Sequence, residues 1–190
     1  MWTVENRARY GRSRLRYPSD LTDEEWTLAK AEIPRAKRGG NAPGLNSGAS
    51  AMVVADRAFA EKQGIAPTGR LVAYGVAAVE PGFFGLGPAP AVRQALERAG
   101  WTLSDIDRIE INEAFAAVPL AIIKELGLPA DIVNVEGGAI AHGHPIGATG
   151  AVLTTRLLHS MRRDGLRRGV VTLCIGGGQG IALALEAFND

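Results

Sequence analysis

The order of hydrophobic and polar positions divides the chain near residue 40. Beyond that point, short apolar runs alternate with segments whose apolar residues recur three or four positions apart, the spacings of strands and helices. Glycine and proline mark most of the boundaries between them. The predicted strands are 50–55, 70–76, 106–111, 169–175 and 181–188, and the predicted helices are 56–63, 90–99, 113–126 and 146–163. This alternation predicts an α/β domain in which a sheet is covered by helices.

The first 39 residues have a different pattern. Five arginines lie within ten positions, at Arg7, Arg9, Arg12, Arg14 and Arg16. A short helix is predicted from about residue 22, capped by Asp20 or Thr22 and ended by Pro34. Arginines in contact with phosphates would give salt-dependent binding of nucleic acid. A solvated tail is favoured, because the stretch contains no folded recognition domain.

Composition places the chain among ordinary globular proteins. Of its 190 residues 46% are hydrophobic and 22% charged, and the net charge is +1, which favours neither nucleic acid nor a membrane surface as partner. A single cysteine, Cys174, excludes an intrachain disulfide and fits a reducing compartment. The start lacks the apolar core of a secretory signal, and no apolar run approaches the roughly 20 residues that span a bilayer. We therefore expect a cytoplasmic protein.

Two histidines, His142 and His144, lie in a glycine-rich segment directly before a predicted helix. Glycines allow the backbone to approach a ligand, and a histidine at a helix N-terminus can move protons or donate to an oxyanion. A tight turn with solvent-facing histidines is an equal alternative. A metal site formed by the two rings is disfavoured, because no third ligand lies at a fixed spacing.

Cys174 and Asn112 each follow or end a predicted strand. The glycine run after Cys174 offers N–H groups that could point at an oxyanion beside the thiol, although a lone cysteine at a strand end is more often inert packing. Asn112 could cap the following helix or hold a water at the carboxyl ends of the strands, where α/β sheets tend to bind ligands.

Five short motifs, in this order, resemble those of the thiolases: Gly40-Asn41-Ala42-Pro43-Gly44-Leu45-Asn46, Gly85-Leu86-Gly87-Pro88, Asn112-Glu113-Ala114-Phe115, Gly143-His144-Pro145-Ile146-Gly147 and Cys174-Ile175-Gly176-Gly177-Gly178. The resemblance covers about residues 40–190 and is with the C-terminal half of those enzymes. It implies a thiolase-type fold, one βαβαβαββ half of an α-β-α-β-α layered sandwich. It also implies two segments, a thiolase C-terminal domain at 40–190 and a separate N-terminal stretch at 1–39.

The resemblance implies an acyltransferase that performs thiolysis or Claisen condensation of acyl-CoA thioesters, without a tightly bound cofactor. The residue matching His144 activates an acylated cysteine, and the one matching Asn112 holds a water in the same oxyanion hole. The residue matching Cys174 is the acid/base, and the N–H matching Gly176 serves a second oxyanion hole. A histidine and oriented dipoles would lower the pKa of such a thiol. The resemblance further implies contacts with coenzyme A at Gly85, Gly87, Pro88 and Phe115, and a homo- or hetero-oligomer.

Three departures from the thiolase pattern matter. The half that carries the acylated cysteine has no counterpart, so we expect a truncated chain that is inactive alone. Pro43 stands where many thiolases have a serine, and His142 stands where many have an apolar residue and is assigned no chemistry. A non-catalytic partner of an intact thiolase, or of a separate N-terminal half, is the alternative function.

Residues 1–39 resemble the start of an insertion-sequence transposase, through Trp2-Thr3-Val4-Glu5-Asn6, Tyr17-Pro18-Ser19-Asp20-Leu21-Thr22-Asp23-Glu24-Glu25-Trp26 and the stretch from Ile33-Pro34 to Lys37-Arg38-Gly39-Gly40. This resemblance implies a natural gene fusion. An unrelated N-terminal extension is the alternative.

Overall fold

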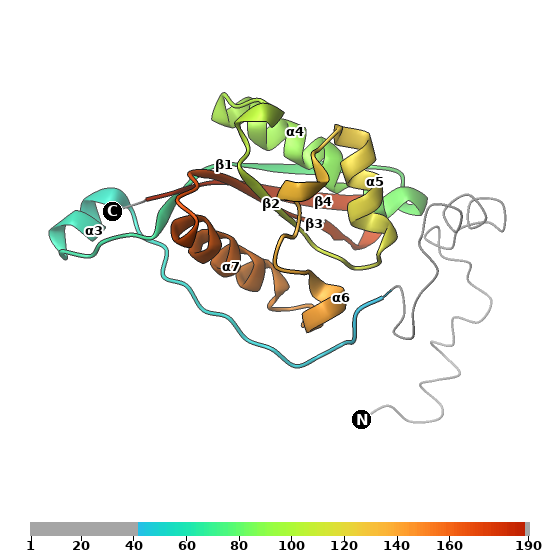
Figure 1. Cartoon of the computed structure of the whole chain (residues 1–190), viewed down its shortest axis with the longest axis horizontal. Helices are drawn as coiled ribbons and strands as arrows, with labels where there is room; N and C mark the ends of the chain where they lie inside the picture. Colours follow the sequence, from blue (N-terminus) through green and yellow to red (C-terminus); the bar gives the residue numbers. More distant parts are fainter. Residues whose placement is uncertain (1–41, 189–190) are drawn as a thin grey trace.

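A mixed four-stranded sheet organises the part of the chain that the computed structural model describes, residues 42–188 (Figure 1). The strands are β1 (Gly69–Ala78), β2 (Arg108–Ile111), β3 (Arg168–Ile175) and β4 (Gln179–Ala187). Their order across the sheet is β1-β4-β3-β2. Strands β2 and β3 are parallel, whereas β4 is antiparallel to both of its neighbours.

Helices cover both faces of this sheet. On one face lie α4 (Pro88–Ala99) and α5 (Ala117–Leu126), and on the other lies α7 (Thr149–Arg163), as Figure 1 shows. The buried face of α7 is a stripe at intervals of four residues, Leu153, Leu157 and Met161, all at most 1% exposed. Such a stripe faces a single surface of a helix, so α7 packs against β3 and β4 through it. The sheet face covered by α4 and α5 holds the larger of the two hydrophobic clusters.

Short helical segments complete the described chain. They are α3 (Arg57–Lys62), η1 (Pro81–Leu86), η2 (Leu103–Asp105), η3 (Ala130–Ile132), α6 (Ala139–His142) and η4 (Gly176–Gly178). None of the helices described between residues 42 and 188 is both long and apolar enough to cross a membrane.

The α/β class is confirmed, and most predicted elements are present with shifted ends. The helices predicted from residues 113 and 146 begin later, at Ala117 and Thr149. Before α7, the N–H of Ala148 donates to the carbonyl of Pro145 at 2.7 Å, so Pro145–Ala148 forms a turn rather than the first helical turn.

The prediction of a strand at 50–55 is wrong for this structure, because these residues are extended but paired with no strand among the described residues. The outer edge of β1 does not accept them. The N–H of Val76 donates to Gln94 Oε1 at 2.8 Å, and Arg98 Nη1 donates to the carbonyl of Tyr74 at 2.7 Å. Side chains of α4 thus occupy two of the polar groups that a further strand would need.

The helix predicted in the first 39 residues, and the boundary placed at residue 40, lie outside the described residues.

Candidate functional site

His144 lies between two polar side chains from different elements. Its Nδ1 is 2.7 Å from Thr149 Oγ1, on the first turn of α7, and its Nε2 is 3.4 Å from Asn112 Nδ2, just after β2. The turn Pro145–Ala148 brings Thr149 back toward the ring five residues earlier. The structure therefore brings together two of the predicted site residues, His144 and Asn112, and adds a third.

The surrounding hydrogen bonds define which ring nitrogen of His144 holds the proton. Thr149 Oγ1 donates to the carbonyl of Pro145 at 2.9 Å, so toward the ring it accepts. Nδ1 is then the protonated nitrogen, and the lone pair of Nε2 faces the Asn112 amide. Burial lowers the pKa of His144 below its ordinary value, which keeps the ring neutral near pH 7. A neutral Nε2 held in this way can accept a proton.

Asn112 extends the pairing of β2 with β3, because its N–H donates to the carbonyl of Thr172 at 3.0 Å. The residue is 1% exposed, and its Oδ1 is buried without a hydrogen-bond partner among the described residues. Leaving a buried acceptor unpaired costs free energy, so Asn112 Oδ1 is suited to accept a hydrogen bond from a water or a bound molecule.

A clamp formed by Asn134 and Glu113 ties this strand end to the loop that leads to His144. Asn134 adopts φ 47°, and its side chain accepts from the N–H of Ile111 at 2.8 Å and donates to the carbonyl of Ile111 at 2.9 Å. Asn134 Nδ2 also donates to Glu113 Oε1 at 3.1 Å, and Glu113 Oε2 accepts from the N–H of Ile140 at 2.9 Å. Asn134 thus occupies the outer edge of β2 in the way a short strand would.

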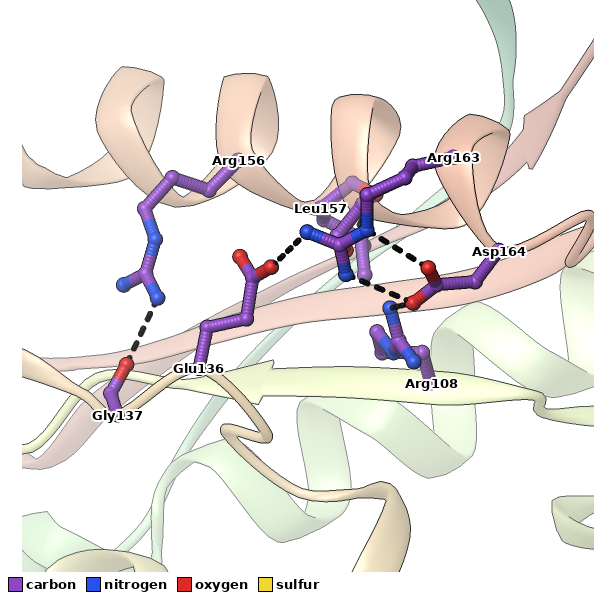
Figure 2. A network of polar contacts seen from close by, with 8 residues as sticks. Arg108, Glu136, Gly137, Arg156, Leu157, Arg163 and Asp164 are labelled. Carbon is purple, nitrogen blue, oxygen red and sulfur yellow. Dashed lines mark hydrogen bonds and ion pairs between the residues drawn. The ribbon is translucent and has the colours of Figure 1, made fainter.

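A second set of contacts holds the same loop against α7, as Figure 2 shows. Arg156 donates to the carbonyl of Gly137 at 2.8 Å, and Arg163 pairs with Glu136. Arg156 Nη1 also lies 2.6 Å from His142 Nε2 and 3.7 Å from the buried carboxylate of Glu110. His142 therefore has a structural partner of its own, separate from those of His144. Among residues 42–188, no cluster of three or more residues suited to hold a metal is present.

Cys174 lies on β3, at the same end of the sheet as Asn112. Ile111 pairs with Thr172, so Asn112 and Cys174 follow that pair by one and two residues at the carboxyl ends of parallel strands. The thiol is half-buried and free, and burial raises its pKa. The expectation of a lowered pKa is wrong, because desolvation of the thiolate outweighs the one favourable backbone hydrogen bond. Near pH 7 Cys174 is a protonated thiol.

The glycine run after Cys174 forms a tight turn between β3 and β4. Gly177 and Gly178 have φ of 76° and 84°, and the carbonyl of Gly178 accepts from the N–H of Val79 at 2.8 Å. Gly176 is the first, exposed residue of η4, which lies against η1. The positive φ values explain why glycines occupy the turn.

Of the four residues expected to contact coenzyme A, two are buried. Gly87 and Pro88 lie under β4, where a Cβ on Gly87 would come within 2.7 Å of the Gln179 carbonyl oxygen. Gly85 is half-buried in η1, and Phe115 is 48% exposed, with its ring edge-to-face against Phe84 at 6.3 Å between centroids. The exposed ring of Phe115 is available to a ligand, and Gly85 is partly so.

Sequence reasoning missed Thr149, Asn134, Glu113, Glu110 and Arg156 as residues that shape the site. Glu113 stood inside a motif that had been singled out, but its partners, Asn134 and Ile140, lie more than twenty residues away. A periodicity within one element carries no signal for such pairs.

The chain belongs to the thiolase family: the family described as "Thiolase, C-terminal domain" matches residues 65–187. It is similar to acetyl-CoA acetyltransferase of Shinella zoogloeoides, with 53% identity over 149 residues, which is 78% of this chain and 38% of that protein. It is also similar to the cytosolic acetyl-CoA acetyltransferase of Mus musculus, with 48% identity over 169 residues, 89% of this chain and 40% of that protein. The chain thus spans about two fifths of the length of these relatives.

Solved structures agree with this assignment. The acetyl-CoA acetyltransferase of Bacillus anthracis is 43% identical, with a TM-score of 0.77 over 90% of this chain and 44% of that one. Human mitochondrial 3-ketoacyl-CoA thiolase in complex with CoA is 43% identical, with a TM-score of 0.69 over 70% of this chain and 34% of that one. The thiolase-type half fold is therefore confirmed.

Proposed function

We propose that residues 42–188 carry one part of the active site of a thiolase-type acyltransferase that acts on acyl-CoA thioesters in the cytoplasm. The observation that supports it best is the neutral His144, whose Nε2 lone pair faces Asn112 at the strand end that also bears Cys174. Acyl transfer requires a base, oxyanion donors and a proton-carrying thiol close to one another, and here all three lie at one end of the sheet. The names of the relatives, acetyl-CoA acetyltransferase and 3-ketoacyl-CoA thiolase, favour the same chemistry.

In this proposal His144 Nε2 accepts the proton of a nucleophilic thiol. With Asn112, it then holds the oxygen that becomes negative during acyl transfer. The unpaired Oδ1 of Asn112 accepts from a water that donates to the same oxygen. Cys174, protonated near pH 7, delivers its proton to the leaving carbon in thiolysis, and the thiolate so formed takes the proton of the attacking coenzyme A sulfur. The N–H of Gly176 supports the second oxyanion.

Coenzyme A thioesters are the proposed substrates, with no tightly bound cofactor. Phe115 and Gly85 are the proposed contacts near the ligand. Gly87 and Pro88 are instead buried at the start of α4, where the backbone packs closely under β4.

The 190 residues alone are proposed to lack turnover. Their one cysteine is Cys174, whose raised pKa makes it a poor nucleophile, and acyl-enzyme chemistry needs a second thiol. Activity would then require a nucleophilic thiol from outside these 190 residues.

The test is thiolysis of acetoacetyl-CoA by the purified chain. The assay is then repeated after co-expression with the part of the Shinella acetyltransferase that precedes its match to this chain. We expect no activity from the chain alone and activity from the pair. His144→Ala and Cys174→Ala should each lower the activity of the pair by about 10² to 10⁴-fold. His159→Ala, at an exposed histidine of α7, is the matched control and should leave the rate unchanged. Turnover by the chain alone that Cys174→Ala abolishes would refute the proposal.

A further inference from the structure

Three polar contacts in a row join β2 to the segments on the α7 side of the sheet. From the start of β2 to its end they are Arg108 Nη1 to Asp164 Oδ2 at 2.7 Å, Glu110 Oε2 to Arg156 Nη1 at 3.7 Å and Asn112 Nδ2 to His144 Nε2 at 3.4 Å. Alternate residues of a strand share a face, which is why positions 108, 110 and 112 all point this way. The proposed base His144 therefore takes part in the last contact of the row, and Arg156 takes part in the contact beside it.

Arg156 joins three parts of the fold. Its Nη2 donates to the carbonyl of Gly137 at 2.8 Å (Figure 2), and its Nη1 lies 2.6 Å from His142 Nε2 and 3.7 Å from Glu110 Oε2. A guanidinium carries donors only, so the Nε2 of His142 accepts. Gly137 and His142 both lie in the segment that leads into His144. One side chain of α7 thus holds that segment at two points.

The buried carboxylate of Glu110 fixes where the guanidinium of Arg156 lies. Glu110 is 1% exposed, and its Oε2 accepts no hydrogen bond from residues 42–188. At 3.7 Å the guanidinium is attracted to this carboxylate without donating to it, so its N–H groups stay available to the segment. The Arg156 side chain is only 21% exposed, and water therefore screens the attraction less than at an open surface.

Thr149 defines which nitrogen of the His144 ring holds the proton, but it does not by itself set the approach of Nε2 to Asn112. A single contact at Nδ1 lets the ring turn with the backbone that carries it. That backbone continues from α6, whose last residue is His142. The hydrogen bond that Arg156 donates to His142 therefore acts on the 3.4 Å distance between His144 and Asn112.

We propose that Arg156 is a positioning residue for His144: its guanidinium holds residues 137–142 between α7 and β2 and so sets the approach of His144 Nε2 to Asn112. The inference rests on the proposed function and deepens it, because it names the side chain that aims the proposed base.

The experiment follows the histidine ring nitrogens of the full chain by NMR, in wild type and in Arg156→Met, which keeps the aliphatic stem and removes the donors. In the variant the pKa of His144 should rise toward 6.5, because a displaced segment exposes the ring, and both neutral tautomers should appear. The amides of Ile140 and Gly143, bonded to Glu113 and Ala139, should exchange at least about tenfold faster.

Two further arginine variants separate the hydrogen bonds of Arg156 from its charge. Arg156→Lys keeps the charge beside Glu110 but replaces the fork of the guanidinium by one nitrogen, so it should behave as Arg156→Met does. Arg163→Met is the matched control, because Arg163 of α7 also reaches the segment, through Glu136 (Figure 2). The Arg163 side chain is 58% exposed, so its loss should leave the pKa and the tautomer of His144 unchanged.

Arg156→Met removes the cation that pairs with buried Glu110, which can destabilise the fold. The double variant Glu110→Gln/Arg156→Met removes both charges and should show the same changes at His144, with thermal melting to confirm that it is folded. An unchanged pKa and tautomer of His144 in the folded double variant overturns the inference. Wild-type behaviour of Arg156→Lys, or an equal effect of Arg163→Met, overturns it as well.

The thiolysis assay of the co-expressed pair distinguishes failure of this inference from failure of the proposed function. Arg156→Met should lower kcat at least about tenfold with little change in KM, as expected when a base is misaligned. Altered His144 signals in Arg156→Met, together with no thiolysis by the wild-type pair, refute the proposed function and leave the positioning role standing. Thiolysis that Arg156→Met leaves unchanged refutes the positioning role and leaves the function standing.

Discussion

Glu110 is a carboxylate that the fold buries without a hydrogen bond to its Oε2. It lies on β2, 1% exposed, with Arg156 Nη1 3.7 Å away, too far for a hydrogen bond. Burial raises its pKa from 4.5 to about 7, Glu136 and Glu113 add to that effect, and Arg156 and Arg108 oppose it. At about 1.4 kcal/mol for each pKa unit, the shift corresponds to about 3 kcal/mol.

The sign of the effect on stability follows from the direction of this pKa shift. A carboxyl group whose pKa is higher in the folded state binds its proton more tightly there than in the unfolded chain. Its contribution to stability is complete below about pH 4.5 and is lost as the pH rises through about 7. Glu110→Gln, which is neutral at every pH, avoids that loss. The variant should therefore gain stability relative to wild type by about 2 to 3 kcal/mol as the pH rises from 4.5 to 8. The loss of the ion pair between Arg156 and Glu110 reduces this gain.

The assay is urea unfolding of wild type and Glu110→Gln at intervals from pH 4.5 to 8. The difference between the two proteins isolates the titration of Glu110, because the other groups titrate in both. Glu97→Gln, at an exposed glutamate of α4, is the control and should show a flat difference. A flat difference for Glu110→Gln would refute the argument from burial. A difference that falls with rising pH would mean that the ion pair with Arg156 outweighs burial.

Three further predictions concern the site and its support. In NMR titration His144 should titrate below pH 6.5 with Nδ1 protonated in the neutral ring, and a pKa at or above 6.5 would contradict the assigned burial. Gly180→Ala should lower the free energy of unfolding by at least about 2 kcal/mol, because its Cβ would overlap the Gly87 carbonyl. Gly150→Ala on α7, with open space around it, should change that free energy by less than about 1 kcal/mol. Thermal or urea unfolding measures both, and equal effects would refute the expected difference. Cys174 should react with a disulfide reagent at pH 7 at least about tenfold more slowly than free cysteine and gain full reactivity in urea, and fast reaction in the native state would show a thiolate instead.

Local pattern was enough to place the elements that form the sheet and its cover. The periodic apolar positions of α7 and the alternation around β1 and β4 predicted those elements to within three residues at each end. The run at 50–55 was misread for a reason that no local pattern reveals. Its composition is that of a strand, but a strand forms only where a neighbouring edge is open, and Gln94 and Arg98 bind two of the backbone groups on the outer edge of β1.

The sequence by itself determined the family, the α/β alternation and the residue types of the candidate site, because motifs and periodicities are properties of neighbouring positions. Only the tertiary structure decided the state of those residues. Asn112 and His144 are 32 positions apart, and Glu110 and Arg156 are brought together from different elements. The proton on His144 Nδ1, the protonated thiol of Cys174 and the raised pKa of Glu110 depend on burial and on hydrogen bonds across the fold. Those quantities are set by distance and desolvation in space, which the order of residues along the chain does not contain.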